Sequence, residues 1–207
     1  AAGAQIVAQP IITVSRQHGS RGRDLASRLA ERFQYTLLHR DVIDRISLCT
    51  GHVRRLLAAR DEHSRSQLTM WADSMISGKY LDESDYAVGL LKTVQSISRL
   101  GGVVVVGRGA NFIVESTGGV HLRVVAPLDE RIRNLMRRGS LSADEAAREI
   151  KAVDQERAKF VRKLFHRSVD DPLGYDVIVN ESGRSLDDLV RIATIVVEEK
   201  LARLKAG

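Results

Sequence analysis

The strongest indication of the fold of this chain is the stretch Ile11-Ile-Thr-Val-Ser-Arg-Gln-His-Gly-Ser-Arg-Gly-Arg23. Its first four residues are all β-branched, and three of them are apolar, which is typical of a buried parallel strand. Two glycines follow within the stretch, and then Leu25, Leu29 and Phe33 recur every four residues, as on the apolar face of a helix. We therefore predict a strand, a glycine-containing turn and a helix, in that order.

Further short apolar runs alternate with helical patterns over the rest of the chain. The runs that we predict to be strands lie at residues 35–38, 101–107, 120–126 and 176–180. The helical patterns between and after them lie at residues 128–138, 142–166 and 185–204. Strands that alternate with helices are typical of a parallel sheet covered on both sides. We therefore predict an α/β fold of three layers with a doubly wound, parallel, five-stranded sheet.

Length and composition indicate one globular domain. The 207 residues carry 32 Lys+Arg and 26 Asp+Glu, for a net charge of +6, and 43% of them are hydrophobic. We predict a flexible segment at residues 1–9 and a single domain at residues 10–207. Within that domain, residues 39–100 contain no strand-like run and no proline, so we predict a helical insertion there.

Composition also argues against several classes of protein. No apolar run approaches the roughly 20 residues that cross a bilayer, and Cys49 has no second cysteine for an intrachain disulfide, so we expect a cytoplasmic protein. The six histidines include no pair at the spacing of a helical zinc site, so we expect no metal held by protein side chains alone. Aromatic residues make up only 4% of the chain, so we do not expect a nucleic-acid stacking platform.

The loop after the first predicted strand is the best anion site in the sequence. In parallel sheets, ligands bind at the carboxyl ends of the strands. Gly19 and Gly22 leave backbone N–H groups free at the start of a helix, and Arg16, Arg21 and Arg23 add positive charge. This arrangement predicts phosphate binding. The alternative is a tight turn whose arginines are only solvated.

A second basic loop follows the run at 101–107. Arg108 stands between Gly107 and Gly109, where the backbone leaves a buried strand, and its guanidinium could hold a second phosphate with two hydrogen bonds. The alternative is an arginine in a flexible surface turn. A third group of cations lies on the helices of the second half. We predict that residues 137–167 form a short lid that carries Arg157 and Arg162 over a bound nucleotide, although most of this charge fits a solvated helix face.

Six segments, in this order, resemble the bacterial cytidylate kinase-like family of the nucleoside monophosphate kinases. They are ITVSRQHGSRGRDLASRLAERF, LLHRDVID, VVVVGRGANFI, HLRVVAPLDERIRNLM, DQERAKFVRKLF and YDVIVNESGRSLDDLV. The resemblance extends from residue 11 to about residue 201. It implies a P-loop kinase fold, with the insertion at 39–100 binding the acceptor and a short lid. It also implies that the chain uses ATP and Mg²⁺ to phosphorylate CMP or a related small phosphorylated acceptor, without a membrane partner, and it leaves a homo-oligomer open.

The resemblance implies a role for each matching residue. Those expected to hold the phosphates of ATP are Gly19, Ser20, Arg21, Gly22, Arg23 and Asp24, with Asp24 also facing the metal. Those expected to bind the acceptor are Arg16, Arg45, Arg108 and Asp154. Those expected to act on the transferred group are Arg157, Arg162 and Arg23.

The chain departs from the family pattern in the loop itself. The Walker sequence G-x-x-x-x-G-K-[ST] is absent. Aligned through Gly19 and Ser20, the lysine position carries Gly22 and the metal-side hydroxyl position carries Asp24. The aspartate of the family's G-R-D motif is replaced by Gly109. Two hypotheses follow: a kinase with a rebuilt loop, or a non-catalytic regulatory domain that binds a nucleotide or phosphate.

Overall fold

The computed structural model describes residues 9–47, 83–114 and 118–206. The chain divides into two compact units, one made of residues 1–40 and 97–207 and the other of residues 41–96. The predicted insertion at 39–100 has nearly the bounds of the second unit. Much of that insertion, residues 48–82, lies outside the described residues, as do residues 1–8 of the predicted N-terminal segment.

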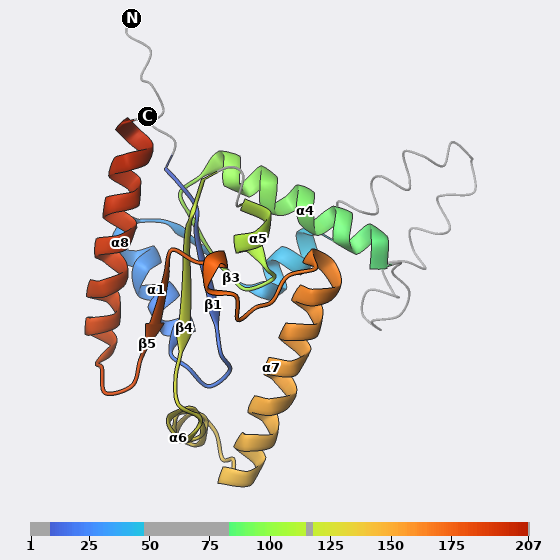
Figure 1. Cartoon of the computed structure of the whole chain (residues 1–207), viewed down its shortest axis with the longest axis vertical. Helices are drawn as coiled ribbons and strands as arrows, with labels where there is room; N and C mark the ends of the chain where they lie inside the picture. Colours follow the sequence, from blue (N-terminus) through green and yellow to red (C-terminus); the bar gives the residue numbers. More distant parts are fainter. Residues whose placement is uncertain (1–8, 48–82, 115–117, 207) are drawn as a thin grey trace, which may run out of the picture. The chain divides into compact units, whose positions relative to one another are not determined.

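The first unit contains one parallel sheet of five strands (Figure 1). The strands are β1 (Ile12–Arg16), β2 (Thr36–Leu38), β3 (Val103–Val106), β4 (Val120–Val125) and β5 (Val177–Asn180), in the spatial order β2-β3-β1-β4-β5. Each lies within or beside a run that the sequence predicts to be a strand. The register pairs Val14 with both Val106 and Leu122, so β1 lies between β3 and β4 and the carboxyl ends of the three strands meet at one edge.

Helices cover both faces of this sheet (Figure 1), which confirms the predicted three-layer α/β fold. On one face, α1 (Gly22–Phe33) and α8 (Leu186–Ala206) pack against each other and against the strands. The core there joins the inward side chains of the sheet, such as Val14 and Val104, to Leu25 of α1 and Leu189 of α8. On the other face, the short helix α5 (Ala110–Val114) packs against β1. The four valines of β3 are all buried, because both faces of this strand are covered.

Helix α7 (Ala143–Phe165) lies within the predicted lid at residues 137–167. It packs against α6 (Leu128–Arg138), of which only the last two residues fall in that range. Their contact is apolar and small, formed around Leu135, Ala146 and Ile150. The N-terminus of α7 carries a capping box, in which Ser142 and Glu145 satisfy each other's backbone N–H groups. After α7, the turn η1 (Pro172–Gly174) leads into β5.

In the second unit, the described residues are helical. A helix that begins at Arg40 continues over residues 41–47, and α4 (Glu83–Leu100) begins within this unit. Ile43, Leu90 and Val94 are buried, and the hydroxyl of Tyr86 donates to Asp44 Oδ1 at 2.7 Å. Helices are what the sequence predicts for this stretch.

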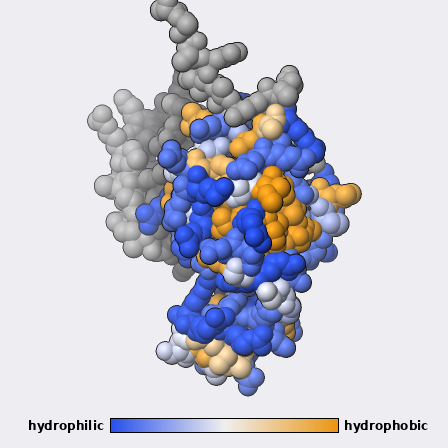
Figure 2. All heavy atoms as spheres, turned by 90° about the vertical axis from the view of Figure 1, so that its left-hand side faces the viewer, coloured by the Kyte–Doolittle hydropathy of each residue, from blue (hydrophilic) through white to orange (hydrophobic). Residues whose placement is uncertain are grey.

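The face of the first unit on the side of α8 is mostly hydrophilic. Figure 2 shows this face, with a prominent cluster of hydrophobic side chains among hydrophilic ones and smaller hydrophobic areas near its edges. Apolar side chains that α8 and β5 leave exposed are Ile195, at 61%, and Ile178, at 39%. Across the described ranges, no helix combines the length and the hydropathy that a membrane span requires.

Candidate functional site

The loop between β1 and α1, residues 17–21, has the geometry of an anion-binding turn; we call it the phosphate loop. Helix α1 begins at Gly22 and its N-terminus has no side-chain cap, so its first N–H groups are available to a ligand. Gly19 has a φ of +80°, and a Cβ there would lie 2.8 Å from the carbonyl oxygen of Arg131. Only glycine therefore fits this position without strain.

Two carboxylates hold the two ends of the phosphate loop. The N–H of His18 donates to Asp154 Oδ1 at 2.8 Å, and the N–H of Arg21 donates to Glu181 Oε2 at 2.7 Å. Glu181 is only 1% exposed and also accepts a hydrogen bond from Asn134 Nδ2 at 3.0 Å. Asn134 in turn donates to the carbonyl of Gly19 at 2.9 Å. The shape of the loop is thus set by side chains from α6, α7 and the end of β5.

His18 attaches the loop to the first half of α7 and to α6. Its Nε2 lies 2.7 Å from Glu149 Oε1, and its carbonyl accepts from Arg131 Nη1 at 3.3 Å. The same Nη1 donates to Asp154 Oδ2 at 2.6 Å. Asp154, which the sequence assigns to the acceptor, therefore contacts the loop backbone and a neighbouring arginine.

The start of α1 favours a different alignment with the Walker pattern. Because the helix begins at Gly22, this glycine corresponds to the one that precedes the Walker lysine, and Arg23 and Asp24 then take the positions of the lysine and the hydroxyl residue. Arg23 is exposed. Asp24 forms an ion pair with Arg138 at the end of α6.

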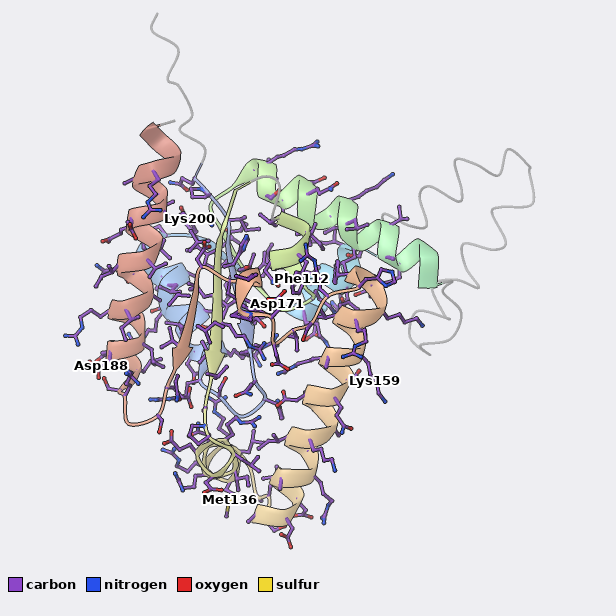
Figure 3. All side chains as sticks on the ribbon, in the orientation of Figure 1. Phe112, Met136, Lys159, Asp171, Asp188 and Lys200 are labelled. Carbon is purple, nitrogen blue, oxygen red and sulfur yellow. The ribbon has the colours of Figure 1, made fainter. Side chains whose placement is uncertain are left out.

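A second feature is a cavity of about 290 Å³ at the carboxyl ends of β1 and β3, facing α7; we call it the basic pocket. The cations that line it are Arg16, Arg40, Arg108, Arg157, Lys159 and Lys163. Among the described residues that line it, Glu156 is the only acid. Aromatic side chains form part of its wall, including Phe112 from α5 and Phe160 from α7; Figure 3 labels Phe112 and Lys159, which come from these two helices. A pocket with this charge favours a multiply charged anion.

The positive charges of the arginines in the basic pocket repel one another. Burial, and then the charges of Arg157, Arg40, Arg23 and Arg108, lower the pKa of Arg16 to about 9. Burial also lowers the pKa of Arg157, an effect that the neighbouring carboxylate of Asp154 opposes. A bound anion would relieve this repulsion.

In the Gly-Arg-Gly turn after β3, the surrounding side chains explain why positions 107 and 109 are glycine. Arg108 adopts a left-handed φ of +55°, and its guanidinium carbon lies 4.9 Å from the centre of the Phe160 ring. A Cβ at Gly109 would collide with the ring of Phe165, and one at Gly107 would collide with the guanidinium of Arg16. The turn therefore brings Arg108 to the same pocket as Arg16, as the sequence predicts for a second phosphate site.

Other predicted residues lie elsewhere. Arg162 is exposed on the last turns of α7 and is not among the residues that line the basic pocket. The guanidinium of Arg21 turns toward the loop after β5, where Nη2 donates to the carbonyl of Arg184 at 2.6 Å. Ser20 donates its hydroxyl proton to the carbonyl of Gln17 at 2.8 Å. Arg45 belongs to the second unit and is exposed there.

Arg21 lines a separate polar cavity beside the phosphate loop. The other residues that line it are Glu130, Arg133, Asn134, Arg137, Glu181, Gly183 and Arg184. Glu181 and Asn134 are not among the phosphate-site residues predicted from the sequence. Glu181 directly follows β5, so the rule that led to the loops after β1 and β3 could have found it, whereas Asn134 gives no comparable signal inside a helix.

The family model described as "Cytidylate kinase-like family" matches residues 11–183. A solved structure of an uncharacterized protein from Eubacterium ventriosum has a TM-score of 0.71 at 18% identity, over 92% of this chain and 99% of that one. A gluconokinase from Sinorhizobium meliloti has a TM-score of 0.54 at 14% identity, over 95% of this chain and 96% of that one. No curated protein sequence matches the chain significantly.

Proposed function

Because the chain belongs to the cytidylate kinase-like family and has a P-loop kinase fold, we propose that it transfers the terminal phosphoryl group of ATP to CMP or a related nucleoside monophosphate. The observation that carries the proposal is that two anion-binding features meet at the end of β1. The phosphate loop begins after Arg16, and the side chain of Arg16 lines the basic pocket. A phosphate donor and a phosphate acceptor bound at these two features would be neighbours.

The donor nucleotide belongs on the phosphate loop in this proposal. The N–H groups at Gly22, Arg23 and Asp24 are at an uncapped helix N-terminus, where the helix dipole favours phosphate. The exposed side chain of Arg23 adds a positive charge in the first turn of α1. The polar cavity beside the loop, lined by Arg21 and Glu181, would take the nucleoside part of the donor.

Mg²⁺ would fit this site as an ion whose ligands come mainly from the phosphates of the bound nucleotide. The described residues contain no group of three or more His, Cys, Asp or Glu side chains arranged to hold a metal. Mg²⁺ bound mainly by phosphates needs only one or two protein carboxylates, and Asp24 is the carboxylate in the first turn of α1. When bound, Mg²⁺ would neutralise charge on the transferred phosphoryl group. To contact the metal, the carboxylate of Asp24 would have to leave its ion pair with Arg138.

The acceptor belongs in the basic pocket. Arg108 and Arg157 would hold its phosphate, and Phe112 and Phe160 would contact its apolar parts. Residues 137–167 would act as the lid. The protein's contribution is to position the two substrates and supply positive charge, with no covalent intermediate.

The test is an ADP-release assay with Mg·ATP and a panel of nucleoside monophosphates, run on the wild type and on Arg23→Ala. We expect turnover with one acceptor and a raised KM for ATP in the variant. Arg203→Ala, which changes an exposed arginine at the far end of α8, serves as the matched control. Absence of ADP release with every acceptor would contradict the proposal.

A second candidate function is a regulatory domain that binds a nucleotide without turnover. The observation in its favour is that two N–H groups of the phosphate loop, those of His18 and Arg21, already donate to carboxylates. The Walker lysine is also absent. This candidate predicts that ATP or CMP raises the Tm while no ADP is released.

A further inference from the structure

Arg16 occupies a place for which two glycines make room. A Cβ at Gly22 would lie 2.6 Å from Arg16 Cβ, and a Cβ at Gly107 would collide with Arg16 Nη1. Gly22 is the first residue of α1, directly after the phosphate loop, and Gly107 begins the turn after β3. Gly22 and Gly107, which belong to the two anion sites predicted from the sequence, thus both leave space for the side chain of Arg16. The backbone of Arg16 is also held, because its carbonyl accepts a hydrogen bond from Arg157 Nη1 at 3.0 Å.

Among the described residues, the guanidinium charge of Arg16 has no compensating carboxylate. In the described part of the chain, no carboxylate forms an ion pair with its guanidinium, and the charges that act on it most are those of four other arginines. A partly buried cation without an acidic partner is costly, and removing it from this cluster would relieve repulsion. Such a residue is explained if an anion binds between the arginines when the protein works.

We propose that Arg16 is the catalytic cation that contacts the phosphoryl group in transit, in place of the Walker lysine. The inference rests on the proposed function and deepens it. In the step concerned, an oxygen of the dianionic acceptor phosphate forms a bond to the terminal phosphorus of ATP. The bond from that phosphorus to the bridging oxygen breaks, and the electron pair leaves with ADP. No proton has to move, and the guanidinium neutralises charge on the oxygens of the transferred group.

Position distinguishes Arg16 from the alternative, Arg23. Arg16 ends β1, directly before the phosphate loop, and it lines the basic pocket. Arg23 is exposed on α1 and is not among the residues that line that pocket. Arg23 therefore belongs to the donor side only, whereas Arg16 lies where donor and acceptor would meet.

Kinetics of Arg16→Gln test the catalytic role, with Arg203→Gln as the matched control. We expect kcat to fall about 10³-fold, because a single cation on the transferred group contributes an effect of this size. Guanidinium ion added to Arg16→Ala should restore part of the turnover, since it supplies the missing group. If Arg16→Gln raises only the KM of the acceptor and leaves kcat unchanged, the catalytic role is overturned.

Thermal unfolding of the same variant separates function from folding. Because Arg16 is repelled by neighbouring arginines and forms no ion pair with a carboxylate of the described residues, we expect Arg16→Gln to unfold at the same Tm as the wild type or at a higher one. A Tm that falls together with kcat, and no recovery with guanidinium, would mean that Arg16 is structural and would overturn the inference.

Inorganic tripolyphosphate tests the phosphate contact without any turnover. We expect it to raise the Tm of the wild type and of Arg203→Gln, and to raise that of Arg16→Gln much less. If no acceptor is phosphorylated but this shift depends on Arg16, the proposed kinase function fails and the phosphate contact of Arg16 stands. If the shift is the same in Arg16→Gln, the inference fails, whatever the turnover of the wild type.

Discussion

Arg157 Nη1 donates a hydrogen bond to the carbonyl of Arg16 at 3.0 Å, and this contact joins α7 to the carboxyl end of β1. It spans 141 residues of sequence. Together with the contact between Asp154 and the N–H of His18, it fixes the phosphate loop and the wall of the basic pocket relative to each other.

Asp154→Ala should lower the free energy of unfolding by about 2 kcal/mol. The carboxylate accepts from the N–H of His18 and from Arg131, and hydrogen bonds to charged groups contribute about 1.5–3 kcal/mol. Urea unfolding measures the loss. Asp144→Ala, on the exposed first turn of α7, is the control and should cost much less. Equal losses in the two variants would show that Asp154 does not hold the loop.

Arg108→Ala should raise the KM of the acceptor by about 10- to 100-fold, because it removes a charge-assisted hydrogen bond to phosphate of about 1.5–3 kcal/mol. The KM for ATP should change little, since Arg108 lies after β3 and not on the phosphate loop. Steady-state kinetics with each substrate varied in turn measure both constants. Arg148→Ala, an exposed arginine of α7, is the control. An unchanged acceptor KM would remove Arg108 from the site.

Glu181→Ala should weaken the binding of ATP and lower stability by about 2–3 kcal/mol. The variant leaves the N–H of Arg21 and the amide of Asn134 without their acceptor, and buried donors without partners carry a penalty of this order. Titration with a fluorescent ATP analogue and urea unfolding measure the two effects. Glu199→Ala on the exposed side of α8 controls for loss of a surface carboxylate. If Glu181→Ala binds ATP with wild-type affinity, the phosphate loop keeps its shape without the hydrogen bonds to Glu181.

His121 should make the protein less stable in mild acid. Burial, and then the charge of Lys200, lower the pKa of His121 to about 4 from 6.5, and the neutral ring lies 2.8 Å from the hydroxyl of Thr13. Between pH 6.5 and about 4 the unfolded chain binds a proton that the folded chain does not, so stability falls as the pH falls through this window. The loss approaches about 3 kcal/mol below pH 4.

Urea unfolding at several pH values checks this slope, with His121→Gln as the comparison. The variant should be less stable at pH 7 and should lose the part of the pH dependence that comes from His121. His166→Gln, an exposed histidine at the end of α7, should keep the wild-type slope. If the free energy of unfolding of His121→Gln depends on pH as that of the wild type does, the acid sensitivity comes from other groups.

Local patterns in the sequence were sufficient for the secondary structure and for two loops of the site. The β-branched runs around Val14 and Val104 predict buried strands, because a strand covered on both faces must be apolar throughout. The glycine-rich turns at Gly19 and Gly107 mark where each strand ends, and parallel strands bring their carboxyl ends to one edge. The basic loops after β1 and β3 could therefore be placed together from the sequence.

Tertiary structure decided which side chains act on those loops. Asp154 and Glu181 reach the phosphate loop across 136 and 160 residues, and local periodicity carries no information about such distant contacts. For the same reason, the spacing of Arg162 on α7 could not show that it lies outside the lining of the basic pocket. Local sequence alone placed glycine-containing basic turns after β1 and β3. The tertiary packing of α7 and of the end of β5 against these turns leaves Arg16 without an ion pair to any carboxylate of the described residues, because charge compensation depends on which groups are close in space.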